Sequence, residues 1–191
     1  MHHHYLLNKP HSYLSQFTNR HRTRRNKKML GGLHDFAPGT MAIGRLDEPS
    51  EGLLLLTTDG KVSAAVNGGG VDKEYYAQVR GVVTDEAIAR MCAGVEIGIH
   101  GKKYVTNPCL VSRVAPAPDF SFPPKREHTG NHGPTSWISV TLREGKYRQV
   151  RKMAAAVGHP VVRLVRVRIG KLRLGDMAAG EVREVEELVY A

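Results

Sequence analysis

Short stretches in which apolar and polar residues alternate recur along the chain, and a period of two is typical of β-strands. Residues 137–142 (WISVTL) and 161–169 (VVRLVRVRI) alternate in this way, and residues 74–79 (EYYAQV) are rich in aromatic and β-branched side chains. A shorter apolar segment, residues 5–7, is followed by Pro10, which lacks a backbone donor. The pattern therefore predicts strands at these four places.

Four consecutive leucines, residues 53–56, form the longest apolar run. A turn signal, residues 58–60 (TDG), follows almost at once, and it favours a strand buried on both faces over one turn of helix. Residues 41–43 lead toward this strand. Residues 44–52 (GRLDEPSEG) connect the two segments and predict a polar elbow.

Two segments predict helices. Thr84 is suited to begin the first, because its hydroxyl can cap free backbone N–H groups, and Gly94 is suited to end it. The second helix covers residues 147–157 and stops before the Gly-His-Pro sequence at 158–160. Strands therefore outnumber helices.

Two polar segments interrupt this pattern. Residues 20–28 (RHRTRRNKK) contain neither an apolar side chain nor an acid, so they must be solvated or bound to an anion. Residues 115–134 are rich in proline, which excludes a central strand or helix. We expect a long insertion loop there that forms a surface flap.

The charge balance indicates a polyanionic partner. The 191 residues include 28 Lys and Arg against 18 Asp and Glu, a net charge of +10. Residues 143–173 alone hold ten basic residues and one acid, and the arginines of residues 161–169 lie mostly on one face of the predicted strand. We therefore expect the C-terminal helix and strand to present a positive surface. Repeated basic stretches favour nucleic acid. A membrane is disfavoured because a spanning helix needs ~20 apolar residues. The N-terminus shows no secretory signal, so we expect a cytoplasmic protein.

Candidate metal ligands are few. Cys92 and Cys109 are the only cysteines, too few for a disulfide framework or a zinc ligand set. His128 and His132 are four residues apart, but they lie in a stretch rich in Pro and Gly, where helical spacing aligns nothing. We therefore expect no metal site.

Asp47 lies in the predicted elbow, two residues after Arg45. By spacing alone, an Asp that follows a strand and shortly precedes a proline is more often a turn former than a catalyst. The context of Asp47 favours a catalytic role, because glycines flank the elbow and the leucine strand that follows it would hold a carboxylate in position for chemistry.

Three segments stand in a characteristic order: residues 44–60 (GRLDEPSEGLLLLTTDG), residues 73–75 (KEY) and residues 144–153 (EGKYRQVRKM). They resemble the GRLD signature, the K-x-Y motif and the E-G-x-x-x-Q-V-R-x-M helix of the bacterial ribosomal-RNA pseudouridine synthases. Alone, Tyr75 would be read as packing and Arg151 as a solvated charge. The ordered match of all three segments reverses both interpretations.

The resemblance implies a catalytic trio. Asp47 would attack the uridine as nucleophile, Tyr75 would pack on the base and help to remove its C5 proton, and Arg151 would pair with Asp47. A guanidinium keeps such a carboxylate ionised and oriented, and an aromatic face gives a flipped base a surface on which to stack. Cleavage of the glycosidic bond, rotation of the base and rejoining through C5 need neither a cofactor nor a metal.

The resemblance also implies the fold and the partner. The fold would be the mixed α/β (α+β) pseudouridine synthase fold, a mainly antiparallel sheet in two lobes with flanking helices and a basic cleft, and residues 1–191 would form one catalytic domain. A monomer would bind ribosomal RNA with the uridine flipped into the cleft. The expected RNA-binding residues are Lys9, Arg22, Arg24, Arg25, Arg45, Lys73, Lys146, Arg148, Gln149 and Lys152.

Residues 8–10 (NKP) resemble the family's N-terminal segment, although Ser12 stands where members commonly have a glycine. Many members begin with a separate small RNA-binding domain, for which we expect no room here, so the chain is most similar to the type E synthases of large-subunit ribosomal RNA. Two alternatives stay open. One is a catalytically silent RNA-binding or ribosome-assembly factor on the same scaffold, and the other is a DNA-binding regulator, for which no recognition-helix pattern is visible.

Overall fold

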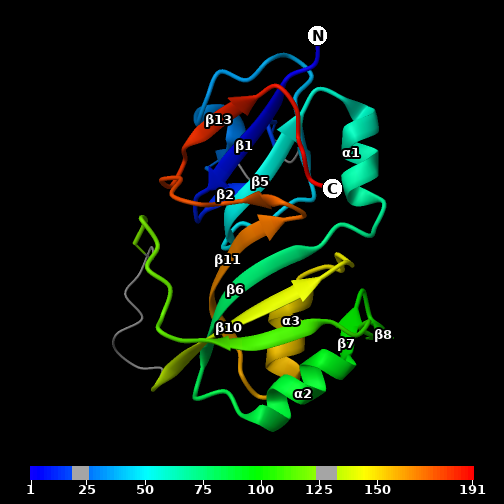
Figure 1. The fold of residues 1–191 in the computed structure, drawn as a ribbon, viewed down its shortest axis with the longest axis vertical. Helices are drawn as coiled ribbons and strands as arrows, with labels where there is room; N and C mark the ends of the chain where they lie inside the picture. The colour runs from blue at the N-terminus through cyan, green and yellow to red at the C-terminus, as the bar shows by residue number, and fades with distance from the viewer. Residues whose placement is uncertain (19–25, 124–132) are drawn as a thin grey trace. The chain divides into compact units, whose positions relative to one another are not determined.

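The computed structural model describes residues 1–18, 26–123 and 133–191 (Figure 1). The chain divides into two compact units, the first comprising residues 1–71 and 166–191 and the second residues 72–165. Most of the basic run 20–28 lies outside the described residues, including Arg22, Arg24 and Arg25, as do His128 and His132. That the whole chain forms one catalytic domain stays a prediction.

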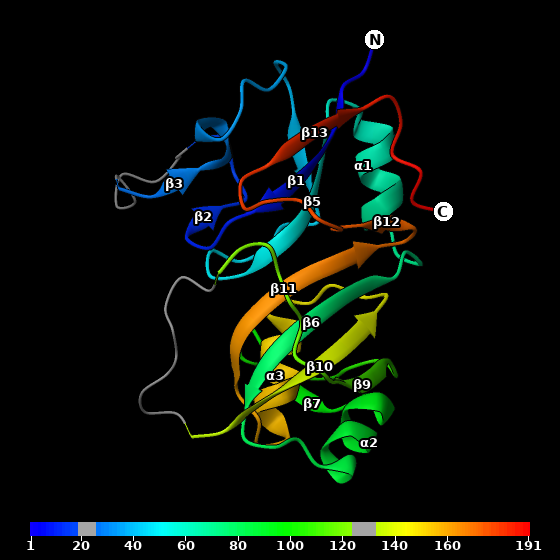
Figure 2. The same ribbon diagram turned by 60° about the vertical axis from the view of Figure 1, so that its left-hand side comes forward.

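The first unit is built on strands in the order β13-β1-β5-β11, with β4 also paired to β5 and β12 to β11. These strands are β1 (His4–Lys9), β4 (Met41–Ile43), β5 (Glu51–Thr57), β12 (Leu172–Arg173), β13 (Val182–Val185) and the second half of β11 (Val161–Ile169). The pairs β1/β13, β1/β5 and β4/β5 are antiparallel. A small parallel pair, β2 (Tyr13–Leu14) and β3 (Lys28–Met29), belongs to the same unit (Figure 2).

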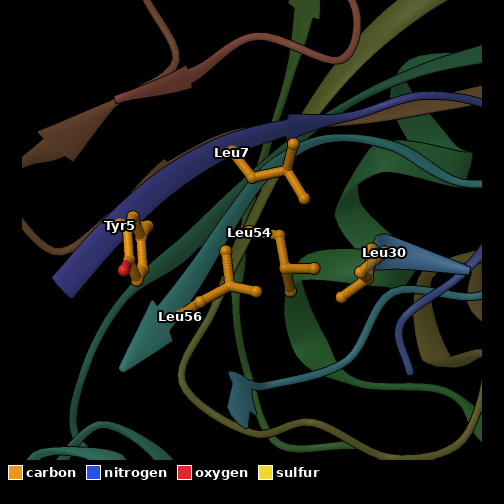
Figure 3. Packing of buried hydrophobic residues seen from close by; sticks show 5 residues of the cluster. All are labelled: Tyr5, Leu7, Leu30, Leu54 and Leu56. Atoms are coloured by element: carbon orange, nitrogen blue, oxygen red, sulfur yellow. The ribbon is translucent and has the colours of Figure 1, made fainter. Parts of the chain in front are cut away.

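The leucines of β5 form the centre of the first unit's core, and all four side chains are fully buried. Leu54 and Leu56 stand opposite Leu7 and Tyr5 of β1, so they share one face of the sheet. Leu30, from a short 3-10 helix (Leu30–Gly32), packs onto this face (Figure 3). The prediction of a strand buried on both faces is confirmed.

A helix that the sequence did not predict, α1 (Gly60–Asn67), packs against β4 and β5. Residues 58–60 were interpreted as a turn only. The Asp59 side chain accepts a hydrogen bond from Lys61 N at 2.8 Å, which caps the helix. The same residue types favour turns and helix starts, and this explains the omission.

The second unit has the strand order β11-β6-β10-β9, in which β6/β10 and β10/β9 are antiparallel, and a separate hairpin of β7 and β8. Helix α2 packs against β9 and α3 against β7. The elements are β6 (Lys73–Arg80), α2 (Asp85–Ala93), β7 (Glu96–Ile99), β8 (Lys102–Val105), β9 (Leu110–Val114), β10 (Thr135–Leu142), α3 (Gln149–Ala156) and the first half of β11.

Both predicted helices are confirmed. The Thr84 hydroxyl caps α2 by accepting from Ala87 N at 3.1 Å, and Gly94 follows its last residue. Helix α3 begins at Gln149, two residues later than expected, because Arg148 has a positive φ of 53°. The mixed α/β class with a mainly antiparallel sheet is confirmed. No helix in the described ranges is long and apolar enough to cross a membrane.

The arginines of β11 do not form the exposed positive face that its alternation suggested. Arg163 and Arg166 are buried, with 8% and 1% of their surfaces exposed. The Arg163 guanidinium lies 5.1 Å from the Phe120 ring centre and 5.4 Å from that of Phe122, and it donates to Phe122 O at 3.1 Å. The described part of the predicted flap is therefore anchored within the second unit.

Candidate active site

The elbow, residues 44–52, is held at both ends by paired strands of the first unit. It leaves β4 after Ile43, which stands opposite Leu55 of β5, and it runs directly into β5. Ser50 N donates to Asp47 O at 3.0 Å, which closes a turn around Asp47. The Asp47 side chain is partly buried. A short, doubly anchored connection therefore carries the predicted nucleophile.

Ser15 fixes the residue immediately before Asp47. Its hydroxyl donates to Leu46 O at 2.8 Å and accepts from Leu46 N at 3.0 Å, and both residues are buried. One side chain thus satisfies the donor and the acceptor of one peptide residue in the interior. No pattern in the sequence links Ser15 to the elbow, because 31 residues separate the two partners.

Arg166 ties together the two ends of the elbow. Its Nη2 donates to Gly44 O at 2.9 Å and its Nε donates to Leu53 O at 2.7 Å. Gly44 has a φ of +60°, and a Cβ there would lie 3.4 Å from Asn67 Oδ1, so this corner favours glycine. A residue whose position in β11 suggested a surface charge is instead a support of the elbow.

Lys9 contacts the elbow from the interior of the first unit and has no exposed surface. Its ammonium donates to Pro10 O and Tyr13 O, both at 2.8 Å, and to Glu48 O at 3.3 Å. Burial lowers the pKa of Lys9 to about 7, although the nearby carboxylates of Glu51, Asp47 and Glu48 raise it. We expected Lys9 to bind RNA. A buried ammonium engaged by three carbonyls instead has a structural role.

Charges on the outer side of the elbow remain accessible. Arg45 is exposed, as expected for an RNA contact. Lys27, one of the described residues of the basic run, forms a 2.8 Å ion pair with Glu48. This end of the run therefore contacts the elbow.

In the second unit, Tyr75 lies on β6 opposite Val140 of β10. It is 9% exposed, and Lys73 on the same face of the strand is 7% exposed. Glu74 points to the opposite face, where its Oε1 accepts from Ser139 Oγ at 3.0 Å. Tyr75 is therefore held on a rigid strand. Lys73 is mostly buried, and its predicted role in RNA binding stays a prediction.

Glu144 organises the segment that leads into α3. Its carboxylate accepts from Tyr104 Oη (2.5 Å), Asn107 N (2.8 Å) and Gln149 Nε2 (2.5 Å), and the first of these hydrogen bonds raises the pKa of the Tyr104 hydroxyl. Gln149 is 4% exposed, and its Oε1 accepts from Lys146 N at 3.0 Å. Gln149 thus braces this segment, in place of the RNA contact that we expected.

The remaining predicted residues of the second unit are more accessible. Lys146 is exposed, and Arg148, Arg151 and Lys152 are partly buried. Lys152 Nζ donates to Gly98 O at 2.6 Å. Asp47 belongs to the first unit, whereas Tyr75 and Arg151 belong to the second. That the trio assembles stays a prediction.

The fold and the ordered segments on it define a class of RNA-modifying isomerases. The family model described as RNA pseudouridylate synthase matches residues 3–156, and the chain belongs to this family. The matched region includes the elbow, β6 and α3, which carry Asp47, Tyr75 and Arg151.

Individual relatives agree with this assignment. The chain is 36% identical over 186 residues to ribosomal large subunit pseudouridine synthase E of Vibrio parahaemolyticus serotype O3:K6, covering 95% of this chain and 73% of the relative. It is 38% identical over 182 residues to the protein of the same name from Xanthomonas campestris pv. campestris, covering 93% and 92%. A crystal structure of a pseudouridylate synthase matches with a TM-score of 0.72 at 25% identity, covering 97% of this chain and 70% of that one.

Proposed function

We propose that the protein converts a uridine of large-subunit ribosomal RNA to pseudouridine, with Asp47 as the nucleophile. The observation that supports this role is the immobilised backbone around Asp47. Ser15 holds Leu46, Arg166 holds Gly44 and Leu53, and Lys9 holds Glu48. A carboxylate on such a frame loses little orientational freedom when it attacks, which is a large part of the catalytic advantage of a preorganised site.

The reaction is an internal rearrangement that balances without a co-reactant. The Asp47 carboxylate forms a transient bond to the uridine, the bond between N1 and C1′ breaks, and the base turns. A bond between C5 and C1′ forms, and the bond to Asp47 breaks, which releases the carboxylate. C5 loses its proton and N1 gains one, so the formula of the nucleoside does not change. Tyr75 packs on the base and helps to remove the C5 proton, and Arg151 pairs with Asp47 and orients its carboxylate.

The RNA contacts belong to the same proposal. Arg45, Lys146, Arg148 and Lys152 are the accessible cations that would contact phosphates, and Arg22, Arg24 and Arg25 of the basic run would add to them. We propose a cytoplasmic monomer that works without a cofactor or a metal. Flipping of the uridine is part of the mechanism, because C1′, C5 and C6 are not reachable inside a stack.

Mapping of pseudouridines in ribosomal RNA tests the proposal. We expect cells that lack the gene to lose pseudouridine at a large-subunit position and to regain it when the wild-type gene is restored. Loss at a small-subunit position alone would contradict the large-subunit assignment. An unchanged map would contradict the proposed activity and favour a catalytically silent RNA-binding factor.

A further inference from the structure

An exposed aromatic pair in the second unit has no part in the proposed reaction. Tyr147, in the segment before α3, stacks on His100, with ring centres 5.7 Å apart and planes inclined by 25°. Tyr147 keeps 57% of its surface exposed, and His100 is also exposed. Exposed aromatic rings on a strongly basic protein are suited to stack on nucleic-acid bases.

The backbone on both sides of this pair adopts an uncommon conformation. His100 and Gly101 form the two-residue turn between β7 and β8, since Ile99 pairs with Lys102, and His100 has a φ of +48°. Arg148, which follows Tyr147, has a φ of +53°. Only one other described residue besides the glycines, Ser12, has a positive φ. A two-residue hairpin turn favours a positive φ at His100. Non-glycine residues with a positive φ cost free energy, and they cluster at functional sites.

The adjacent segment is braced so that Tyr147 projects outward. Gln149 N donates to Lys146 O at 3.1 Å, and Lys146 N donates to Gln149 Oε1 at 3.0 Å, which closes a turn with Tyr147 at its second position. Gln149 is in turn anchored on Glu144. The backbone position of Tyr147 is therefore fixed by partly buried hydrogen bonds.

One lysine lies beside the pair, and further lysines lie on the segment before α3 and on the β7–β8 hairpin. Lys152 Nζ lies 5.0 Å from the centre of the Tyr147 ring, and Lys146 Nζ lies 4.8 Å from the centre of the Tyr104 ring in β8. Lys102 is exposed at the end of the same hairpin. Aromatic faces among cations are the usual means of binding an unpaired nucleotide, because the ring stacks on the base and the cations approach the phosphates.

We propose that Tyr147 and His100 form a second base-binding site, which stacks an unpaired RNA base other than the reacting uridine. This second site depends on the proposed function in one respect, namely that the protein binds RNA. An aromatic stack discriminates weakly among bases, so the site would fix the position of a loop nucleotide and would not read its sequence.

The experiment measures the dissociation constant of the full-length protein for an in vitro transcript of large-subunit ribosomal RNA at several salt concentrations. Tyr147→Ala should weaken binding roughly 5- to 150-fold, the range for loss of one base stack. The loss should be similar at every salt concentration, since no charge is removed. Tyr147→Phe keeps the ring and should bind like the wild type. Leu110→Ala, at another exposed hydrophobic residue, is the matched control.

His100→Gly separates a binding role from a structural one. Glycine suits a φ of +48°, so this variant should unfold at the same temperature as the wild type or a higher one. It should nevertheless bind the transcript roughly 2- to 13-fold more weakly, because an aromatic partner is lost. Wild-type affinity in Tyr147→Ala would overturn the second site while leaving the proposed reaction intact. A wild-type protein that fails to bind the transcript would overturn both.

Discussion

Three buried polar side chains position Asp47, and each acts through the backbone of a neighbour. Each side chain forms hydrogen bonds with the backbone of the elbow: Ser15 with Leu46, Lys9 with Glu48, and Arg166 with Gly44 and Leu53 at its two ends. Polar groups are costly to bury unless they are hydrogen-bonded, so each interior position depends on these contacts. The sequence predicted a catalytic role for Asp47 through its motif. It did not identify its supports, because their partners lie up to 122 residues away.

Ser15→Ala tests this dependence. It leaves the buried N–H and C=O of Leu46 without the hydroxyl, which should cost about 1–3 kcal/mol of unfolding free energy. Urea denaturation measures this loss, and single-turnover pseudouridine formation should fall with it because the elbow loosens. Ser112→Ala, at an exposed serine of β9, is the control and should change neither quantity. Wild-type stability in Ser15→Ala would contradict the assigned role.

Lys9 should impose a pH dependence on stability. Its pKa is lowered to about 7 in the folded protein from the ordinary value of 10.5, so between these values the unfolded chain binds a proton that the folded chain does not. The unfolding free energy should therefore rise with pH across this window, by at most about 1.4 kcal/mol per unit. The comparison is with Lys9→Met, which lacks this proton. Parallel pH profiles of the two proteins would show that Lys9 titrates normally.

At the scale of elements, alternation and turn residues were sufficient to predict most of the sheet strands and helices α2 and α3. They failed where one residue type serves two purposes, as with Asp59, which caps α1. They also failed where the tertiary structure overrides local preference, as at Arg148, whose positive φ delays the start of α3. The prediction that the arginines of β11 are exposed was wrong for the same reason. Arg163 and Arg166 are buried by contacts that no local sequence pattern encodes.

Gly94 illustrates an element boundary that only glycine permits. It ends α2 with a φ of +101°, and a Cβ there would lie 2.3 Å from Thr106 O. Gly94→Ala should therefore lower the unfolding free energy by at least about 2 kcal/mol, as thermal or urea unfolding would show. Gly98→Ala in β7 is the matched control, because nothing lies within 4 Å of the added carbon. Equal stability of the two variants would contradict the steric argument.

At the scale of the whole molecule, the net charge of +10 predicted a polyanionic partner but not which cations face it. Lys9, Arg163 and Arg166 are buried and carry structural contacts. The cations that can contact RNA are found from the solvent exposure of their side chains, which the sequence did not reveal. Family motifs predicted the trio of Asp47, Tyr75 and Arg151, whereas its assembly depends on contacts that the motifs do not specify.

The salt dependence of RNA binding separates these classes of cation. Arg45→Gln removes an exposed charge beside Asp47, and it should reduce the slope of log affinity against log salt by about 0.7 to 0.9. Arg183→Gln is the control, because Arg183 already pairs with Glu181 at 2.6 Å and Asp176 at 3.0 Å. An unchanged slope in Arg45→Gln would remove Arg45 from the proposed RNA-binding surface.

The central claim is that Asp47 performs the chemistry, and single-turnover conversion by Asp47→Ala tests it most directly. The variant should keep its unfolding temperature and bind the ribosomal RNA transcript nearly as well as the wild type, yet form no detectable pseudouridine. Asp35→Ala, at an exposed carboxylate of the first unit, should convert the RNA normally. Pseudouridine formation by Asp47→Ala at the wild-type rate would contradict the account.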